Sequence, residues 1–237
     1  MNTKEEKYNK FALIREMLQT SDIIRSFNPE VSEKFVKAIK SRKGLFLTGE
    51  GSSRIFPAKR AIYATMKYGF RTPVITEGCT QAMEYDLKDL AVFAASNSGQ
   101  TKEVIRMVLD LKKKNHDTIF GLTANKNTKL EEHANVTHVL SCGKEDAVAA
   151  TKSVIEQGLF YDSLLRNLHG VKMTGLGELA DKVQQVLTTP VDNEITDTIK
   201  QAGLVYFAGR DNGVAGELAL KTDRKSTRLN SSHRIRS

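Results

Sequence analysis

The 237-residue chain lacks tryptophan and contains only four prolines and two cysteines. Cys79 and Cys142 show no metal-ligand spacing, so we expect two buried free thiols in a reducing compartment. The dispersed histidines form no ligand pattern, and we expect neither a metal nor a cofactor. No apolar run reaches the roughly 18 residues of a membrane span, and the polar N-terminus lacks a signal-peptide core. These absences predict a cytoplasmic protein without a membrane partner.

The net charge of +8 raises the question of nucleic-acid binding, but its distribution argues against it. Residues 223–237 hold five Lys or Arg and a single Asp, which is half of the net charge. The remaining sequence does not interleave aromatic with basic residues, so we expect no nucleic-acid partner. Residues 223–233, DRKSTRLNSSH, resemble the translation of a sequencing adapter. We therefore expect 223–237 to be non-native and leave it out of the fold prediction.

Short apolar runs alternate with longer amphipathic stretches between residues 43 and 170. The predicted strands are 45–48, 73–76, 90–95, 118–122 and 138–140, with helices predicted at 55–68, 102–114 and 130–134. Because the runs show no polar alternation, both faces of each strand should be buried, as in a parallel sheet covered by helices. Right-handed crossovers then give an α/β fold, a three-layer doubly wound sandwich with a five-stranded parallel sheet of the flavodoxin-like kind.

The remaining segments divide the chain into further units. Helices predicted at 11–18 and 31–41 form an N-terminal lead-in over 1–42, and the first α/β domain spans 43–170. That domain ends with a long helix predicted at 147–168. Connecting helices are predicted at 178–187 and 195–201, within the unit 171–202. A strand at 204–208 and a helix at 214–221 indicate the start of a second α/β domain over 203–222.

Three turns rich in small and hydroxyl residues lie where the chain enters a predicted helix. They read GEGSS at 49–53, SNSGQT at 96–101 and AVAATK at 147–152. Because the carboxyl ends of parallel strands share one edge, we expect these turns to converge on one crevice. Helix N-termini there offer free N–H groups and roughly half a unit of positive charge. The pattern therefore predicts an anion site.

Helix capping is the alternative for each turn taken alone, because Ser and Thr are favoured N-cap residues. SNSGQT, however, holds more hydroxyl and amide side chains than a cap needs. No GxxxxGK[ST] phosphate loop occurs, and Arg54 replaces the third glycine of a GxGxxG dinucleotide fingerprint. An anion site of another kind is the better interpretation of the three turns together.

The three motifs together resemble the SIS (sugar isomerase) domain of phosphosugar isomerases, deaminases and glucosamine-6-phosphate synthase. SNSGQT is similar to the SxSGxT phosphate loop of that family, and GEGSS to its first-strand turn. GKEDAVAATK, at 143–152, resembles the E-x-x-VAxTK stretch of the synthase isomerase domain. REMLQTSDIIRSF, at 15–27, resembles the lead-in helix of the same domain. The resemblance covers residues 9–222, and it implies a homo-oligomer.

This resemblance implies which residues hold a phosphorylated sugar or amino sugar. The implied phosphate- and sugar-binding residues are Gly51, Ser52, Ser53, Ser96, Asn97, Ser98, Gly99, Gln100 and Thr101, with Val148 and Ala149 contributing main-chain groups. Glu145 is either an acceptor for a sugar hydroxyl or a helix cap. Glu50 either lines the pocket mouth or is an exposed surface carboxylate.

The resemblance also implies where catalysis would be found. In the family, the glutamate that moves the proton lies three places beyond a lysine in the second SIS half. Lys221 aligns with that lysine, and the position of the glutamate falls on Arg224, inside the adapter-like sequence. We therefore expect a chain that is truncated in its second SIS half and lacks a general base. Its second residue is Asn2 rather than the nucleophilic cysteine of the glutaminase half of the synthase.

Two function classes follow from the resemblance. The parent protein is either an aldose–ketose isomerase or amino-sugar-phosphate deaminase, or it is a phosphosugar-sensing regulatory module without catalysis. Such regulators carry an N-terminal helix-turn-helix bundle of several tens of residues. The lead-in of 1–42 is too short for that bundle, which favours the enzyme.

Overall fold

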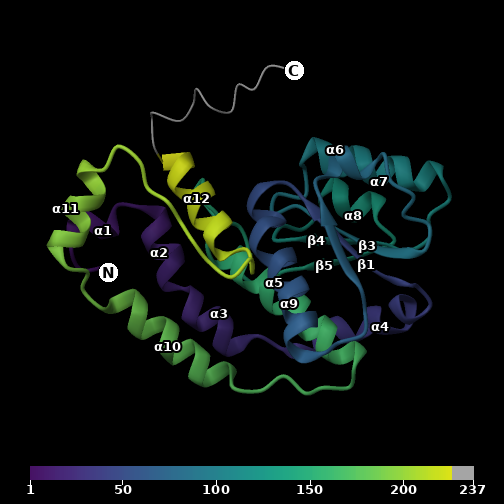
Figure 1. The fold of residues 1–237 in the computed structure, drawn as a ribbon, viewed down its shortest axis with the longest axis horizontal. Helices are drawn as coiled ribbons and strands as arrows, with labels where there is room; N and C mark the ends of the chain where they lie inside the picture. The colour runs from purple at the N-terminus through teal and green to yellow at the C-terminus, as the bar shows by residue number, and fades with distance from the viewer. Residues whose placement is uncertain (226–237) are drawn as a thin grey trace.

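The computed structural model describes residues 1–225 and contains a five-stranded, fully parallel sheet with helices on both faces (Figure 1). The strand order is β2-β1-β3-β4-β5. The strands are β1 (Gly44–Gly49), β2 (Val74–Glu77), β3 (Leu90–Ala95), β4 (Ile119–Thr123) and β5 (Val136–Val139). The predicted α/β class and the five-stranded parallel sheet are thus confirmed. The segment 223–237 was predicted to be non-native, and its residues from 226 on lie outside the part of the chain that the structure describes.

Two buried clusters, one on each face of the sheet, explain why the strands read as continuous apolar runs. Leu45 and Leu47 of β1 point into one cluster, and Phe46 points into the other. The first cluster is covered by α4 (Glu33–Lys40), α5 (Ile55–Tyr68) and α9 (Lys152–Leu168). The second is covered by α6 (Cys79–Ala82), α7 (Lys102–Lys113) and α8 (Lys129–His133). Strands buried on both sides have no solvent face on which to place polar residues.

Aromatic side chains dominate the cluster beneath α9. Phe35 of α4 packs edge-on against Phe93, Phe120 and Phe160, with ring centroids 5.0 to 5.7 Å apart. Edge-to-face pairs of this kind contribute about 1 kcal/mol each beyond the burial of their area. They fix the lead-in and the long helix α9 against the centre of the sheet.

The helices outside the sandwich form an arm on the left of Figure 1. They are α1 (Glu6–Asn9), α2 (Ala12–Leu18), α3 (Thr20–Ser26), α10 (Leu176–Thr188) and α11 (Asn193–Gln201). The short 3₁₀ helices η1 (Pro29–Ser32) and η2 (Gly51–Ser53) precede α4 and α5. Helix α3 lies against α10, where the Ser21 hydroxyl donates to the Gln184 side chain at 2.7 Å. The last helix, α12 (Val214–Lys225), lies against α5.

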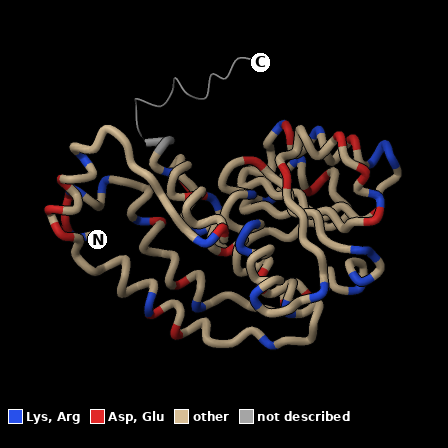
Figure 2. Tube along the Cα trace, viewed as in Figure 1, with Lys and Arg blue, Asp and Glu red and all other residues tan. Residues whose placement is uncertain are grey.

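Charged residues lie mainly on the outer helices and loops, with both signs intermixed (Figure 2). Among the strands, only β2 carries a Lys, Arg, Asp or Glu residue, Glu77 at its end. No helix among residues 1–225 combines the length and apolar character that crossing a bilayer would require.

The structure corrects two element predictions. Residues 204–208 form no strand, and the backbone of 203–210 makes no hydrogen bond with any described residue. Leu204 and Tyr206 are 67% and 85% exposed. No described strand pairs with this segment, and a strand without a partner is not stable. The long helix begins at Lys152 rather than at residue 147. Residues 147–151 instead form a turn, in which side chains accept hydrogen bonds from the N–H groups of Ala147 and Thr151.

Candidate binding site at the carboxyl edge of the sheet

The centre of the sheet holds the topological switch point. The chain leaves β1 toward β2 on one side, while β3 leads to β4 on the other. Gly49 and Ala95, the last residues of β1 and β3, are register partners. A Cβ on Gly49 would lie 2.7 Å from the Ala95 carbonyl oxygen, so glycine is required for this close approach. The turns that follow these strands therefore begin side by side, where doubly wound folds bind ligands.

The first turn forms the 3₁₀ helix η2, which Gly51 opens at a φ of +54°. The Ser52 hydroxyl is buried and has no hydrogen-bond partner among the described residues. The Ser53 carbonyl accepts a hydrogen bond from Gln157 Nε2 of α9 at 2.6 Å. Glu50 accepts one from the Cys79 N–H at 2.9 Å, which places this carboxylate at the start of α6.

The second turn brings its hydroxyls toward one another. Ser96 Oγ lies 2.7 Å from Thr101 Oγ1 and 3.5 Å from Ser98 Oγ. Gly99 has a φ of +65°, and a Cβ there would lie 2.4 Å from the Thr128 side chain. The Gln100 N–H donates to Ser98 Oγ at 3.2 Å. These contacts form a compact loop of hydroxyl groups ahead of α7.

Helix capping does not account for the three turns. The N-cap residues of α5, α7 and α9 are Arg54, Thr101 and Thr151, and none makes a side-chain cap hydrogen bond. The first-turn N–H groups of these helices therefore stay uncapped by their own N-cap side chains. Uncapped helix N-termini attract anions.

The third turn is held by a carboxylate at each end. Glu145 accepts hydrogen bonds from Thr151 N–H at 2.7 Å and Thr151 Oγ1 at 2.8 Å, and also from the Ser153 hydroxyl. Glu16 of α2 accepts from Asp146 N–H at 2.5 Å and from Ala147 N–H at 3.3 Å. The N–H groups between these anchors, at 148–150, have no partner among the described residues. Val148 is 88% exposed, and Ala149 is buried.

Direct contacts join the three turns. Asn97 Nδ2 of the second turn donates to Glu145 at 3.1 Å. Gln157 ties α9, which follows the third turn, to Ser53 of the first turn. The structure thus brings together the predicted residues of all three motifs. Glu145 serves as a turn anchor, and both of its oxygens are occupied by protein donors. The role of each predicted residue toward a ligand stays a prediction.

Lys221 reaches the same turn from α12. Its ammonium group donates to the Ala150 carbonyl and lies 2.8 Å from the Glu217 carboxylate. A cavity of about 610 Å³ adjoins this contact between α2, α9, α10 and α12. Ala149 and Thr151 of the turn and Met17 of α2 form part of its largely apolar wall. Position 224 belongs to α12, but its side chain lies outside what the structure describes.

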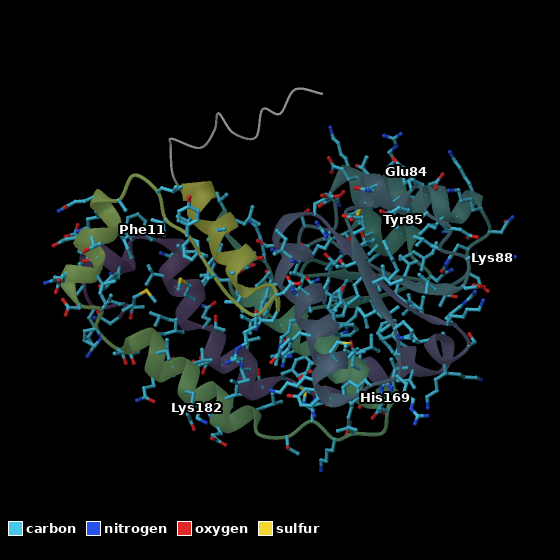
Figure 3. The ribbon with its side chains drawn as sticks, in the orientation of Figure 1. Phe11, Glu84, Tyr85, Lys88, His169 and Lys182 are labelled. Carbon is cyan, nitrogen blue, oxygen red and sulfur yellow. The ribbon has the colours of Figure 1, made fainter. Side chains whose placement is uncertain are left out.

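The two cysteines and His138, the histidine whose pKa is lowered, lack the properties of reactive groups. Cys79 and Cys142 are buried and free, as predicted. Burial raises the pKa of Cys79 to about 12, and burial beside Glu156 raises the pKa of Cys142 further. Burial also lowers the pKa of His138 to about 4. His169 follows the C-terminal end of α9, away from the third turn (Figure 3). Its ring stacks on Phe70.

Sequence reasoning missed Glu16 and Gln157, the two residues that tie the turns to other helices. Glu16 lies beside Leu13 and Met17 on the apolar side of a predicted helix. A carboxylate in that position is 7% exposed here, and carboxylates are rarely so buried without partners. That mismatch was the available signal. Gln157 gave none, because its partner is a main-chain carbonyl.

Comparison with known proteins gives one family and a set of similar folds. The model of the SIS domain family matches residues 38–166. No curated protein sequence matches the chain.

Three solved structures are similar in fold. The C-terminal domain of glucosamine-fructose-6-phosphate aminotransferase from Francisella tularensis superposes with a TM-score of 0.69 and 16% identity, over 92% of this chain and 68% of that one. Glucosamine-6-phosphate deaminase from Thermotoga maritima gives 0.61 and 21%, over 89% and 66%. The Vibrio vulnificus NanR protein, complexed with ManNAc-6P, gives 0.53 and 15%, over 79% and 68%.

Proposed function

Because the chain belongs to the SIS domain family, we propose that it binds a phosphorylated sugar or amino sugar at its three converging turns. The phosphate would lie against the hydroxyls of 96–101 and the Ser52 hydroxyl. The sugar would lie against the N–H groups of 148–150. The observation that carries the proposal is the contact among the turns, with the Ser52 hydroxyl buried and unpaired among the described residues. Buried polar groups are seldom without a partner, so such a hydroxyl indicates a missing ligand or water.

The chemistry of the turns supports an anion in preference to a neutral sugar. The N-terminus of α7 points its first-turn N–H groups toward the second turn. The side chain of the N-cap residue, Thr101, does not bind these groups. A dianionic phosphate there would gain charge-assisted hydrogen bonds from N–H groups and hydroxyls, which are about twice as strong as neutral ones. A similar fold in a protein complexed with ManNAc-6P agrees with this class of ligand.

Isothermal titration calorimetry with glucosamine-6-phosphate tests the proposal. Ser98→Ala removes a hydroxyl of the second turn and should weaken binding at least tenfold, since a hydrogen bond to a charged group contributes about 1.5–3 kcal/mol. Ser41→Ala is the matched control, because Ser41 is exposed just before β1, at the opposite edge of the sheet. Unphosphorylated glucosamine should bind far more weakly than the phosphate ester. Equal affinity of Ser98→Ala and the unaltered chain would contradict the assignment.

We further propose that this chain binds without catalysing isomerisation or deamination. The family position of the proton-moving glutamate carries Arg224, and a guanidinium does not act as a general base at neutral pH. Fructose-6-phosphate incubated with the chain in D2O should therefore keep its C1 protons, which proton NMR would follow. Loss of that signal above the buffer rate would contradict the proposal. The natural gene beyond the Lys221 codon separates an enzyme parent, with glutamate three codons on, from a sensor.

A further inference from the structure

Glu16 is a buried carboxylate beside the third turn, and the proposed sugar site does not yet explain why it is there. It belongs to α2 in the lead-in, lies 130 residues before its partner Asp146, and is 7% exposed. Its carboxylate accepts from two consecutive main-chain N–H groups, at 2.5 Å from Asp146 and 3.3 Å from Ala147. Burying a carboxylate is costly, so these hydrogen bonds must offset the loss of its hydration.

The neighbouring contacts show that the lead-in follows the third turn closely. Gln19, nearly one helical turn beyond Glu16, accepts a hydrogen bond from the Lys152 ammonium at 3.0 Å. Lys152 is only 8% exposed and begins α9, next to the turn. Two side chains of the lead-in therefore hold both ends of the segment 146–152. The segment has no regular secondary structure of its own before Lys152, so its shape depends on such partners.

The contacts of Glu16 and Glu145 determine the orientation of the three N–H groups at 148–150. Glu16 fixes the peptide planes at Asp146 and Ala147, and Glu145 fixes the one at Thr151. The N–H groups at 148–150 keep their directions only while both ends are held. A turn held in place before binding saves the entropy of ordering it on binding.

We propose that Glu16 is a positioning residue of the sugar site, which holds the third turn in its binding conformation by accepting the N–H groups of Asp146 and Ala147. This rests on the proposed sugar-phosphate site. The Glu16 carboxylate uses its oxygens on the main chain of the turn. It therefore acts on the sugar end of the ligand through 148–150, while the phosphate end depends on the second turn.

Two ligands test the sugar end and the phosphate end of the proposed site separately. Glucosamine-6-phosphate engages both ends, and inorganic phosphate engages the phosphate end alone. Glu16→Gln keeps the size of the side chain but faces an N–H group with its own amide donor. It should weaken glucosamine-6-phosphate about tenfold and leave the weaker affinity for inorganic phosphate within twofold. Glu30→Gln is the matched control, because this residue is exposed. It should change neither affinity.

Chemical rescue distinguishes positioning from general stability. Glu16→Ala leaves a space beside the same two N–H groups, so added formate should restore part of its affinity for glucosamine-6-phosphate. Formate should have no such effect on Ser98→Ala. If Glu16→Gln binds both probes like the unaltered chain, the inference fails while the proposed function stands. If the unaltered chain binds neither probe, the proposed function fails instead.

Hydrogen exchange of the unaltered chain gives a reading that needs no variant. Without ligand, the amides of Asp146 and Ala147 should exchange slowly because Glu16 holds them. The amides of 148–150 should exchange fast and become protected only when glucosamine-6-phosphate is added. Fast exchange at Asp146 and Ala147 would overturn the inference, even if the Glu16 variants failed to fold.

Discussion

Replacing Glu145 with alanine should remove the main internal anchor of the third turn. The carboxylate accepts from the Thr151 N–H at 2.7 Å, the Thr151 hydroxyl at 2.8 Å and the Asn97 amide at 3.1 Å, and also from the Ser153 hydroxyl. An unpaired buried donor costs about 1–3 kcal/mol. The hydroxyls can turn to water, but the Thr151 N–H cannot rotate away. We therefore expect a loss of about 2–4 kcal/mol in the free energy of unfolding.

Urea denaturation followed by circular dichroism measures this loss. Glu145→Gln should lose less, about 1–2 kcal/mol, because one oxygen remains to accept while the amide faces donors. Asp146→Asn is the matched control. Among the described residues, the Asp146 carboxylate pairs only with Lys144, at 3.2 Å, and both side chains are at least 70% exposed, so we expect a change within about 0.5 kcal/mol. A loss for Glu145→Ala no larger than for Asp146→Asn would refute the anchor role.

Two further predictions follow from other features of the fold. Gly99→Ala should cost about 2–4 kcal/mol in urea denaturation, because its Cβ would overlap the Thr128 side chain. Gly143→Ala has a similar positive φ with nothing within 4 Å, so it should cost only about 1 kcal/mol, and equal losses would contradict the overlap. His138 has its pKa lowered to about 4 by burial, so the unfolded chain binds the proton more readily. Stability should therefore fall by about 2 kcal/mol, after allowance for solvent screening, as the pH drops from 6.5 toward 4. His138→Phe should flatten that part of the urea-denaturation profile, and an unchanged slope would contradict the assignment.

Much of the sheet could be predicted because each strand is specified locally. The run 90–95 is apolar throughout, and the structure makes it β3 with the same bounds. The run 204–208 is equally apolar, yet it forms no strand, because pairing depends on a neighbour that periodicity does not reveal. The apolar pattern shows that a segment can form a strand, but the surrounding structure determines whether it does.

In the candidate site, too, groups that are adjacent in sequence could be predicted and contacts between distant segments could not. The hydroxyl turn 96–101 was found from its own residues, since the groups that define it are adjacent in sequence. The anchoring by Glu16 was missed, because its partners lie in another motif. The sequence allows Glu145 either a ligand contact or a capping role, and the geometry makes it an anchor of the turn. Contacts between distant segments carry no local pattern from which to predict them.

The third turn joins three parts of the chain that are far apart in sequence. Glu16 is 130 residues from Asp146, and Lys221 is 71 residues from Ala150. Contacts of large sequence separation require the most loop closure and form slowly. We expect the sheet to assemble first and the lead-in and α12 to close on the turn afterwards. In a refolding experiment, secondary structure would then return before ligand binding does, and the delay would measure the time that the chain takes to complete its site.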